Sequence, residues 1–367
     1  MNNSTNNTTE RKSVLILDIK VIDSPQAGIG VARCFKDLGY NVYGADNTPF
    51  ITTSDLFIKT FVLEEIQNLN LDSLVRKFKN LKEIYGINLI VPCYDETSIL
   101  LAFIKDKLDF LGIQIVAPSL DCMRMFRKSN LPNLVIDTDF KTPPTKVIDS
   151  VEEGLDFAGQ IGYPVFAKGL TKDAMIADNP SELESAIKHI SKLWNNSEIK
   201  CIVQKGIVGK FVNVLITYKS NKIVAYTEME KVGVDSHGAT WFGKITTDTN
   251  LLKATEVLCQ KIELNDCIIE LETIREENGD YYLYEINPRT PAWLYASSLN
   301  GLDFIREYLE NTDLELKLTQ QETYFGRETR EFLATSTEIA KYGNLTMFSK
   351  GAAYKSDNTK YPSEVIL

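Results

Sequence analysis

Histidine and closely paired cysteine are scarce in this chain, and their scarcity argues against a zinc site. The sequence has two histidines in 367 residues. Because structural zinc sites need clustered Cys or His ligands, no zinc site is expected. The thiols are better interpreted as buried groups of a cytosolic protein. Six cysteines are scattered without CxxC spacing, at Cys34, Cys93, Cys122, Cys201, Cys259 and Cys267.

Long apolar runs are also missing. No run of eighteen apolar residues occurs, so the sequence predicts no transmembrane helix. The first segment, MNNSTNNTTERK, is polar and lacks the apolar core of a signal peptide. We therefore expect residues 1–12 to form a disordered tail, and we expect a cytoplasmic protein that does not bind membranes.

An excess of positive charge is the third absence. The chain has 40 Lys and Arg against 50 Asp and Glu, a net charge of −10. General nucleic-acid binding needs clustered basic residues, so nucleic acid is not an expected partner. A length of 367 residues with 44% hydrophobic residues predicts two or three domains with substantial cores.

The first third of the chain alternates strand-like and helix-like segments. Four runs are apolar enough for buried strands: SVLILDI from Ser13, NVYGAD from Asn41, INLIVPC from Ile87 and IQIVAP from Ile113. Segments with helical spacing lie between them. This alternation predicts a parallel sheet with helices on both faces.

The segment AGIGVAR partly matches a dinucleotide-binding fingerprint. Gly28 and Gly30 would be its first two glycines and Asp46 would contact the ribose, but Arg33 stands where the third glycine belongs. A partial motif is unspecific, so a structural role for the glycines is favoured. A dinucleotide-binding oxidoreductase stays open as an alternative.

Two acidic runs later in the chain read as a hairpin, CIIELETIR from Cys267 and YYLYEINPRTPAW from Tyr281. Between them, Asn278-Gly279 predicts a two-residue type I′ turn. That turn would place Glu272 opposite Glu285. Because side chains alternate along a strand, the apolar face would carry Ile269, Leu271, Tyr282, Tyr284 and Ile286. The polar face would carry Glu270, Glu272, Glu285, Asn287 and Arg289.

This polar face predicts a cation site. Opposed residues on one face have Cβ atoms roughly 4.5–5.5 Å apart, where like charges repel. An all-oxygen set suits a hard cation, and Mg²⁺ usually takes one or two carboxylates together with substrate phosphates. The alternative is a solvated outer face of a surface hairpin, which would need no ligand.

The run YLYEINPR resembles the final strand of the ATP-grasp fold. The resemblance is to the branch that contains carbamoyl phosphate synthetase, biotin carboxylase and amino-acid or peptide ligases, and it covers about residues 13–310. In that family, a Glu-x-Asn-Pro-Arg strand and an upstream acidic strand hold magnesium. The resemblance therefore implies metal ligands among Glu270, Glu272, Glu285 and Asn287, with ATP and Mg²⁺ (or Mn²⁺) as cofactors.

Two lysines match the family's phosphate-binding positions. Lys128, with Arg127 and Arg124 as competitors, matches a basic residue ahead of the strand entry FKTPPTKVI. Lys168 ends the strand of IGYPVFAKGL, which is similar to the family's GYPVVVKP. A lysine that ends an apolar strand is costly to bury unless it meets an anion. The family's glycine-rich loop is reduced to Gly169, so Thr171 and Lys172 are candidates for part of its role.

The run CIVQKGIVGKF resembles the hinge strand against which adenine packs in the family. The resemblance implies adenine contacts from Gln204, Lys205, Gly206 and Ile207, partly through backbone groups. Lys205 and Lys210 replace acids that are usual in the family.

The segment between the hinge and the acidic hairpin supplies further candidates. The resemblance implies catalytic roles for Lys231 and Lys244, which would meet the γ-phosphate or the acylating carboxylate, and for Arg289. His237 is favoured less, because it reads as a loop residue. Trp293 and Tyr295 would wall an acceptor pocket or fill the core.

The expected fold class is α/β and α+β. The resemblance implies a Rossmann-like domain over residues 13–120, followed by an ATP-grasp domain over 121–310 whose two α+β subdomains grip the nucleotide. The lid subdomain would span about 135–205, and 311–367 would be a C-terminal extension without a family signature.

The activity implied by the resemblance is an ATP-dependent carboxylate-amine ligase. It would act through an acyl phosphate, release ADP and phosphate, and join amino acids, a small peptide or a related metabolite. Its partners would be a small-molecule carboxylate and amine, and a homodimer is compatible with the resemblance. A non-catalytic nucleotide-binding ATP-grasp module is the second alternative, suggested by Lys205, Lys210 and the glycine-poor loop.

Overall fold

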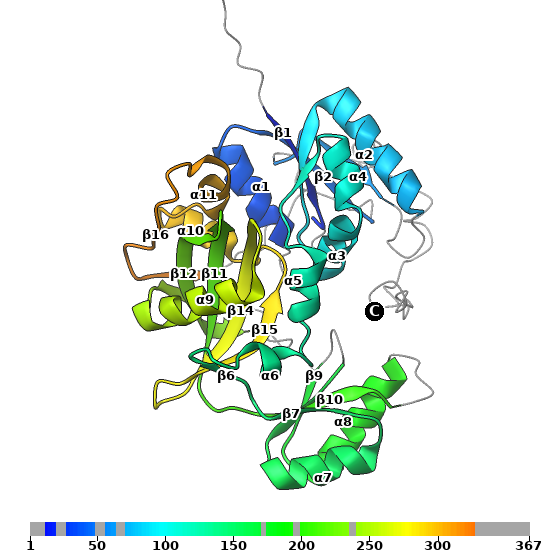
Figure 1. Cartoon of the computed structure of the whole chain (residues 1–367), viewed down its shortest axis with the longest axis vertical. Helices are drawn as coiled ribbons and strands as arrows, with labels where there is room; N and C mark the ends of the chain where they lie inside the picture. Colours follow the sequence, from blue (N-terminus) through cyan, green and yellow to red (C-terminus); the bar gives the residue numbers. More distant parts are fainter. Residues whose placement is uncertain are drawn as a thin grey trace, which may run out of the picture.

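The computed structural model describes residues 12–19, 27–47, 56–63, 70–169, 174–193, 199–234 and 240–326. Several sequence predictions lie outside these residues: the tail over residues 1–11, Thr171, Lys172, His237 and the extension beyond residue 326. The described residues form three sheets with flanking helices, which Figure 1 shows as an upper, a central and a lower part. The mixed α/β class is confirmed.

The upper part is a five-stranded parallel sheet with the order β3-β2-β1-β4-β5. Its inner strand β1 has five buried residues in succession, as expected where helices cover both faces of a parallel sheet. The strands are β1 (Ser13–Leu17), β2 (Asn41–Asp46), β3 (Lys59–Val62), β4 (Ile87–Val91) and β5 (Gln114–Ile115). The helices are α1 (Ala27–Asp37), α2 (Leu71–Tyr85), α3 (Asp95–Phe103) and α4 (Lys105–Phe110).

The two glycines of the partial fingerprint lie inside α1, and the packing of the helix requires a glycine at one of them, Gly28. A Cβ atom on Gly28 would lie 2.7 Å from the backbone oxygen of Asp18, and one on Gly30 would lie 3.5 Å from the Cβ of Tyr295. The glycine at position 28 therefore lets α1 approach the end of β1 closely. This observation supports the structural interpretation of Gly28.

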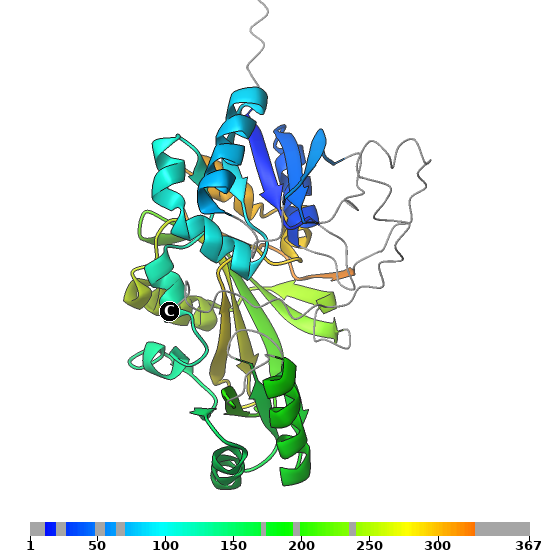
Figure 2. The ribbon, with the colours of Figure 1, turned by 90° about the vertical axis from the view of Figure 1, so that its right-hand side faces the viewer.

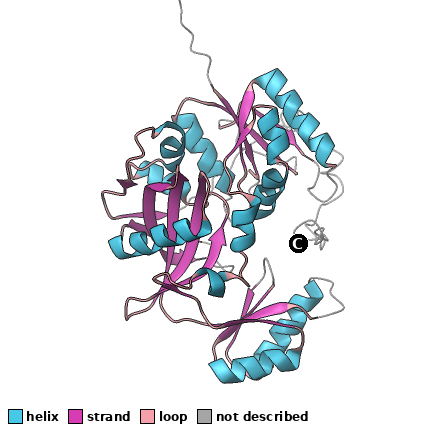
Figure 3. Ribbon diagram, viewed as in Figure 1, coloured by secondary structure: helices cyan, strands magenta, loops and turns pink. Residues whose placement is uncertain are grey.

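The lower part is a small antiparallel sheet with the order β7-β10-β8-β9, and two helices that contact each other cover it (Figure 3). It has its own apolar core, which includes Val165 and Ile187. The strands are β7 (Thr145–Ile148), β8 (Val165–Lys168), β9 (Ala174–Ala177) and β10 (Cys201–Lys205). The helices are α7 (Val151–Ile161) and α8 (Pro180–Leu193).

The central part is an eight-stranded sheet with the order β17-β13-β12-β11-β14-β15-β6, and with β16 paired beside β12. Figure 2 shows this sheet between the other two parts. Its strands are β6 (Phe140–Lys141), β11 (Lys210–Lys219), β12 (Lys222–Val234), β13 (Thr240–Thr246), β14 (Cys267–Arg275), β15 (Tyr281–Asn287), β16 (Lys317–Leu318) and β17 (Thr323–Gly326). Its helices are α5 (Leu120–Met125), α6 (Leu131–Leu134), α9 (Thr249–Ile262), α10 (Leu294–Leu299) and α11 (Phe304–Glu310).

The two faces of the central sheet pack into different cores. Val212 and Val214 of β11 join a core with Leu258 of α9. Leu215, which points to the opposite face, joins a core with Phe304 of α11 and with residues of β1 and α1. Both cores also contain residues of β1, so the parallel sheet contributes to each of them, whereas α9 belongs to the first core and α11 to the second.

None of the helices in the described part combines the length and the apolar character that a membrane crossing requires.

A buried carboxyl group lies where α9 begins. Glu228 of β12 is fully buried, and its Oε1 accepts hydrogen bonds from the Tyr226 hydroxyl at 2.5 Å and from the Asp248 backbone N–H at 2.6 Å. Its Oε2 has no hydrogen-bond partner among the described residues. Burial, together with the charge of Asp248, raises the pKa of Glu228 from 4.5 to about 7.

We expect Glu228→Gln to reduce the loss of stability at neutral and alkaline pH. The folded carboxyl holds its proton more tightly than the unfolded one, so stability falls as the pH rises from 4.5 to about 7. An amide does not ionise, so the variant should avoid up to about 3 kcal/mol of this loss. Urea unfolding at about pH 4 and about pH 8 measures the difference. Glu256→Gln on α9 should keep the wild-type pH dependence, and the same dependence in Glu228→Gln would contradict the assignment.

Candidate active site

The β14–β15 hairpin brings the predicted polar residues together, but by a different route from the one predicted. Glu272 lies opposite Glu285 and Glu270 lies opposite Asn287, as expected. The two-residue turn is wrong, however, because Arg275 pairs with Tyr281 and the Glu276 N–H donates to the Asp280 carbonyl. Within the loop only Gly279 has a positive φ, of 91°, whereas a type I′ turn needs two such residues.

A β-bulge restores the predicted register. The pairing shifts between Glu272 and Thr273, where Thr273 lies opposite Leu283 and leaves Tyr284 as the extra residue. The longer loop and the bulge each move the register by one residue, and the two shifts cancel. As a consequence, Leu283 faces the core, and the predicted core positions of Tyr282 and Tyr284 are wrong.

Glu272 is held by three donors. Its Oε2 accepts from the Tyr284 hydroxyl at 2.7 Å and from the Lys231 ammonium at 2.9 Å, and its Oε1 accepts from the Asn287 amide at 2.9 Å. Burial alone would raise the pKa of Glu272, but Lys231 and the other donors lower it to about 2. Glu272 is therefore ionised and paired with Lys231.

Glu270 is held more tightly still. Its Oε1 accepts from the Asn213 amide at 2.6 Å and from the Trp293 indole at 2.7 Å. Its Oε2 accepts from Asn287 at 3.0 Å and lies 3.6 Å from Nη1 of Arg289. Trp293 is thus a buried anchor for Glu270. The Glu270 side chain is 4% exposed, against 17% for Glu272 and 27% for Glu285, so it is the least accessible of the three carboxylates to a metal ion.

Glu285 is the most exposed of the three carboxylates and pairs with Lys128. The Lys128 Nζ lies 3.1 Å from Glu285 Oε1, and the two side chains are 13% and 27% exposed. Burial raises the pKa of Glu285, and Lys128 opposes this effect. Lys128 lies in the turn between α5 and α6, whereas its competitor Arg124 pairs with Asp121 at the surface.

Lys168 approaches the same carboxylates from the lower sheet. It ends β8, is 8% exposed, and donates to Gln204 Oε1 on β10 at 2.6 Å. Its Nζ also lies 5.5 Å from the centre of the Tyr284 ring. Burial and the nearby Lys128 lower the pKa of Lys168 to about 8, against the opposing effect of Glu285.

The predicted hinge residues connect the lower and central sheets. Gln204 is buried and donates to the Thr145 hydroxyl at 2.9 Å, which fixes its amide toward Lys168. The Lys205 ammonium donates to the carbonyl groups of Gly162 and Tyr163, so this side chain ties β10 to the loop after α7. Because the Lys205 ammonium is engaged in this way, only the backbone of Lys205 is suited to contact an adenine ring. Gly206 is buried and Ile207 is half-buried at the start of the connection to β11.

Lys231 belongs to the site and Lys244 does not. Lys231 of β12 lies opposite Gly243, which places Lys244, the next residue, on the other face of the sheet. Lys244 instead pairs with Glu322 at 2.7 Å. The prediction of Lys244 as a catalytic residue is therefore not supported by its position.

Arg289 follows β15 and reaches the parallel sheet. Its Nε donates to Asp95 Oδ1 at 3.0 Å, at the first residue of α3. The sequence reasoning missed Asp95, which lies 194 residues earlier in the chain. Tyr295, which was expected near an acceptor pocket or in the core, packs against the core that contains α1 and also contacts Arg33 and Asp37 of that helix.

The donor set suits a hard cation in its chemistry, although the side chains are not arranged around one. No group of three or more His, Cys, Asp or Glu side chains in the described ranges is placed to hold a metal ion. Glu285, Glu272 and Asn287 nevertheless offer the oxygen ligands that Mg²⁺ prefers. Two ammonium groups already lie within 3.1 Å of the two carboxylates, so cations are stabilised at this place.

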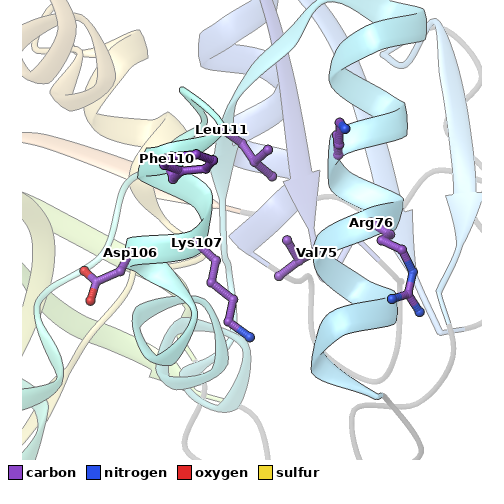
Figure 4. Close-up of a pocket in the computed structure, with 7 residues that line it drawn as sticks. Val75, Arg76, Asp106, Lys107, Phe110 and Leu111 are labelled. Atoms are coloured by element: carbon purple, nitrogen blue, oxygen red, sulfur yellow. The ribbon is translucent and has the colours of Figure 1, made fainter.

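A separate hollow of about 360 Å³ lies between α2 and α4, beside the parallel sheet (Figure 4). It is lined by Val75, Arg76, Lys79, Asp106, Lys107, Phe110 and Leu111. Phe110 is 92% exposed at its rim. The hollow contains no residue of the candidate site.

Solved structures of several ligases and carboxylases are similar to this chain. The biotin carboxylase domain of 2-oxoglutarate carboxylase from Hydrogenobacter thermophilus has 19% identity and a TM-score of 0.62, over 81% of this chain and 68% of that one. L-amino acid ligase from Bacillus licheniformis has 12% identity and a TM-score of 0.62, over 83% and 74%. Phosphoribosylglycinamide synthetase from Anaerococcus prevotii has 17% identity and a TM-score of 0.58, over 84% and 76%.

A search of protein-family models gives no match. The structural likeness, at identities below 20% for the three structures named, bears on the fold alone. The likeness in fold agrees with the order of the sequence segments: the strand that ends at Lys168, the hinge run from Cys201 and the acidic hairpin from Cys267. The chain therefore has the ATP-grasp fold.

Proposed function

We propose that the protein is an ATP-dependent carboxylate-amine ligase that acts through an acyl phosphate. The observation that carries the proposal is the convergence of basic side chains on the Glu272/Glu285 pair. Lys128 comes from the α5–α6 turn, Lys168 from β8 and Lys231 from β12, and all three act electrostatically on these carboxylates. Such a cluster, which joins carboxylates with lysines, is suited to a nucleotide phosphate chain and its metal ion.

The nucleotide would lie between the lower and central sheets. Lys128 and Lys168 would hold its phosphates, and Gln204, Gly206, Ile207 and the Lys205 backbone would line the adenine. Mg²⁺ (or Mn²⁺) would be held by Glu285 and Glu272 with Asn287, and it would neutralise charge on the phosphates. The 2-oxoglutarate carboxylase structure was determined with MgADP, which supports this choice of cofactors.

The chemistry begins with the substrate carboxylate, whose oxygen attacks the γ-phosphorus while ADP leaves. Lys128, Lys168 and Arg289 would neutralise the charge that develops on the transferred phosphoryl group. Lys231, held by Glu272 at 2.9 Å, would be directed at the same group. An amine then attacks the acyl carbon, phosphate leaves with the former carboxylate oxygen, and an amide remains.

The substrate class we propose is an amino acid, a small peptide or a related metabolite. The likeness to L-amino acid ligase and to phosphoribosylglycinamide synthetase supports it. We also propose the division of the chain given by the sequence, with a Rossmann-like domain over 13–120 and an ATP-grasp domain over 121–310. Strands β16 and β17 continue the central sheet beyond that boundary.

The atoms of the released phosphate test the proposal. With a carboxylate substrate labelled with heavy oxygen, we expect one labelled oxygen in the phosphate and ADP as the nucleotide product. A panel of acids and amines, scored by phosphate release with ATP and Mg²⁺, first identifies the substrate. Mass spectrometry of the phosphate then measures the label.

The other outcomes identify the alternatives. Label in AMP would show adenylation, and unlabelled phosphate would exclude the acyl phosphate. ATP binding with Mg²⁺ but without turnover across the panel would favour a non-catalytic module. Binding of NAD(P) in place of ATP would favour an oxidoreductase. Sedimentation velocity would test the homodimer.

A further inference from the structure

The contact between Arg289 and Asp95 joins two distant parts of the chain at the candidate site. Arg289 lies two residues after the end of β15, and Asp95 is the first residue of α3. Their side chains are 24% and 39% exposed, so the pair lies at the edge of the site and borders solvent. Burial raises the pKa of Asp95, and Arg289 opposes this effect, as expected for an ion pair.

Asp95 is held in place by the parallel sheet. The strand order β3-β2-β1-β4-β5 reverses direction between β1 and β4, and ligands of open α/β sheets bind at the carboxyl ends of strands at such a point. Asp18, after β1, accepts from the Cys93 N–H at 3.1 Å and from the Thr97 hydroxyl at 2.9 Å. These two bonds lie on either side of Asp95 in the chain and fix the start of α3.

The other contacts of Arg289 are longer. Its Nη1 lies 3.6 Å from Glu270 Oε2 and donates to the Thr290 carbonyl at 3.3 Å. The 3.0 Å bond from Nε to Asp95 is therefore the shortest of these contacts and fixes the plane of the guanidinium group. The Nη2 group takes part in none of the three. A planar guanidinium group that is held at Nε presents its remaining N–H donors in one direction.

We infer that Asp95 is the positioning residue of Arg289. It holds the guanidinium fork so that its outer donors face the substrate carboxylate and the phosphoryl group transferred to it. This inference rests on the proposed function for the identity of the substrate. In this arrangement the parallel sheet helps to orient the substrate carboxylate through Arg289. Asp95 itself does not contact the substrate.

The contact itself is tested by NMR of the arginine side chains. The Nε–H signal of Arg289 is identified by its absence in Arg289→Lys. We expect this signal to shift in Asp95→Asn and to stay unchanged in Glu96→Gln, which removes a neighbouring carboxylate on the same helix. An unchanged signal in Asp95→Asn would overturn the inference.

The positioning role is tested by kinetics on the same variants. In Asp95→Asn the kcat/KM for the carboxylate substrate should fall roughly 10- to 100-fold, the loss that misplacement of a group facing the substrate causes. Asp95→Glu should recover part of it, and ATP affinity measured by calorimetry should stay at the wild-type value in both. A shifted signal with an unchanged kcat/KM would also overturn the inference. Failure of the proposed function would look different, because wild-type protein would then release no phosphate with any carboxylate.

Discussion

Glu285→Gln is expected to abolish ATP-dependent turnover, with a loss of roughly 100-fold or more. The change removes one negative charge from the pair that would hold the metal ion, and it removes the partner of Lys128. Loss of a group that stabilises charge in the transition state typically costs roughly 100- to 1,000-fold in rate. Phosphate release with ATP and Mg²⁺ measures the loss, and calorimetry measures the affinity for Mg²⁺ in the presence of ADP.

The fold should survive this substitution. Relief of the repulsion from Glu272 and loss of the Lys128 ion pair oppose each other, so the free energy of unfolding should change by no more than about 1 kcal/mol. Glu277→Gln in the loop of the same hairpin is the matched control and should leave turnover unchanged. Full activity in Glu285→Gln would rule out the proposed metal site.

Lys168→Ala is expected to weaken ATP binding by roughly 10- to 100-fold and to leave adenosine binding almost unchanged. The Lys168 Nζ is buried beside Gln204 and near Lys128, where an ammonium group is stable only with anions close by. A charge-assisted hydrogen bond to phosphate contributes about 1.5–3 kcal/mol, which gives the expected range. Adenosine lacks the phosphates and would not detect the loss.

The pKa of Lys168 adds a second test. Its value of about 8 means that the ammonium is present at neutral pH and is lost as the pH rises further. ATP affinity of the wild type should therefore fall as the pH rises through about 8, and in Lys168→Ala this component should disappear. Lys146→Ala, an exposed lysine of β7, is the control. Equal losses for ATP and adenosine would show that Lys168 is structural.

The positions of the two key carboxylates could be predicted from alternation along the strands. Polar residues at every second position identified one face of the hairpin, and that face was correct for Glu272 and Glu285. The turn was not, because Asn278-Gly279 also suits a loop in which only Gly279 needs a positive φ. No local sequence pattern predicts the bulge at Tyr284, which compensates for the one-residue shift in register caused by the longer loop.

Other parts of the candidate site depend on contacts that no local pattern encodes. Lys244 has the right charge in the right segment, but the register of β12 with β13 places it on the wrong face. Asp95 is an acidic residue at the start of a helix, a common position for such residues, so the local sequence does not mark it as part of a site. Its partner Arg289 lies 194 residues away. In contrast, the two-residue turn Ser220-Asn221 between β11 and β12 is a local feature, and both residues have positive φ, of 49° and 62°.

The core shared by α1 and α11 has a consequence for synthesis on the ribosome. Val31 and Phe35 of α1 pack with Trp293, Phe304 and other residues that are translated nearly 270 positions later. A nascent chain that has not yet released this late segment exposes the apolar side of α1 to solvent. Domains generally fold as units during synthesis, with the N-terminal one first. Here the apolar side of α1 is covered only after α10 and α11 have been made, so termination before them should give an aggregation-prone product.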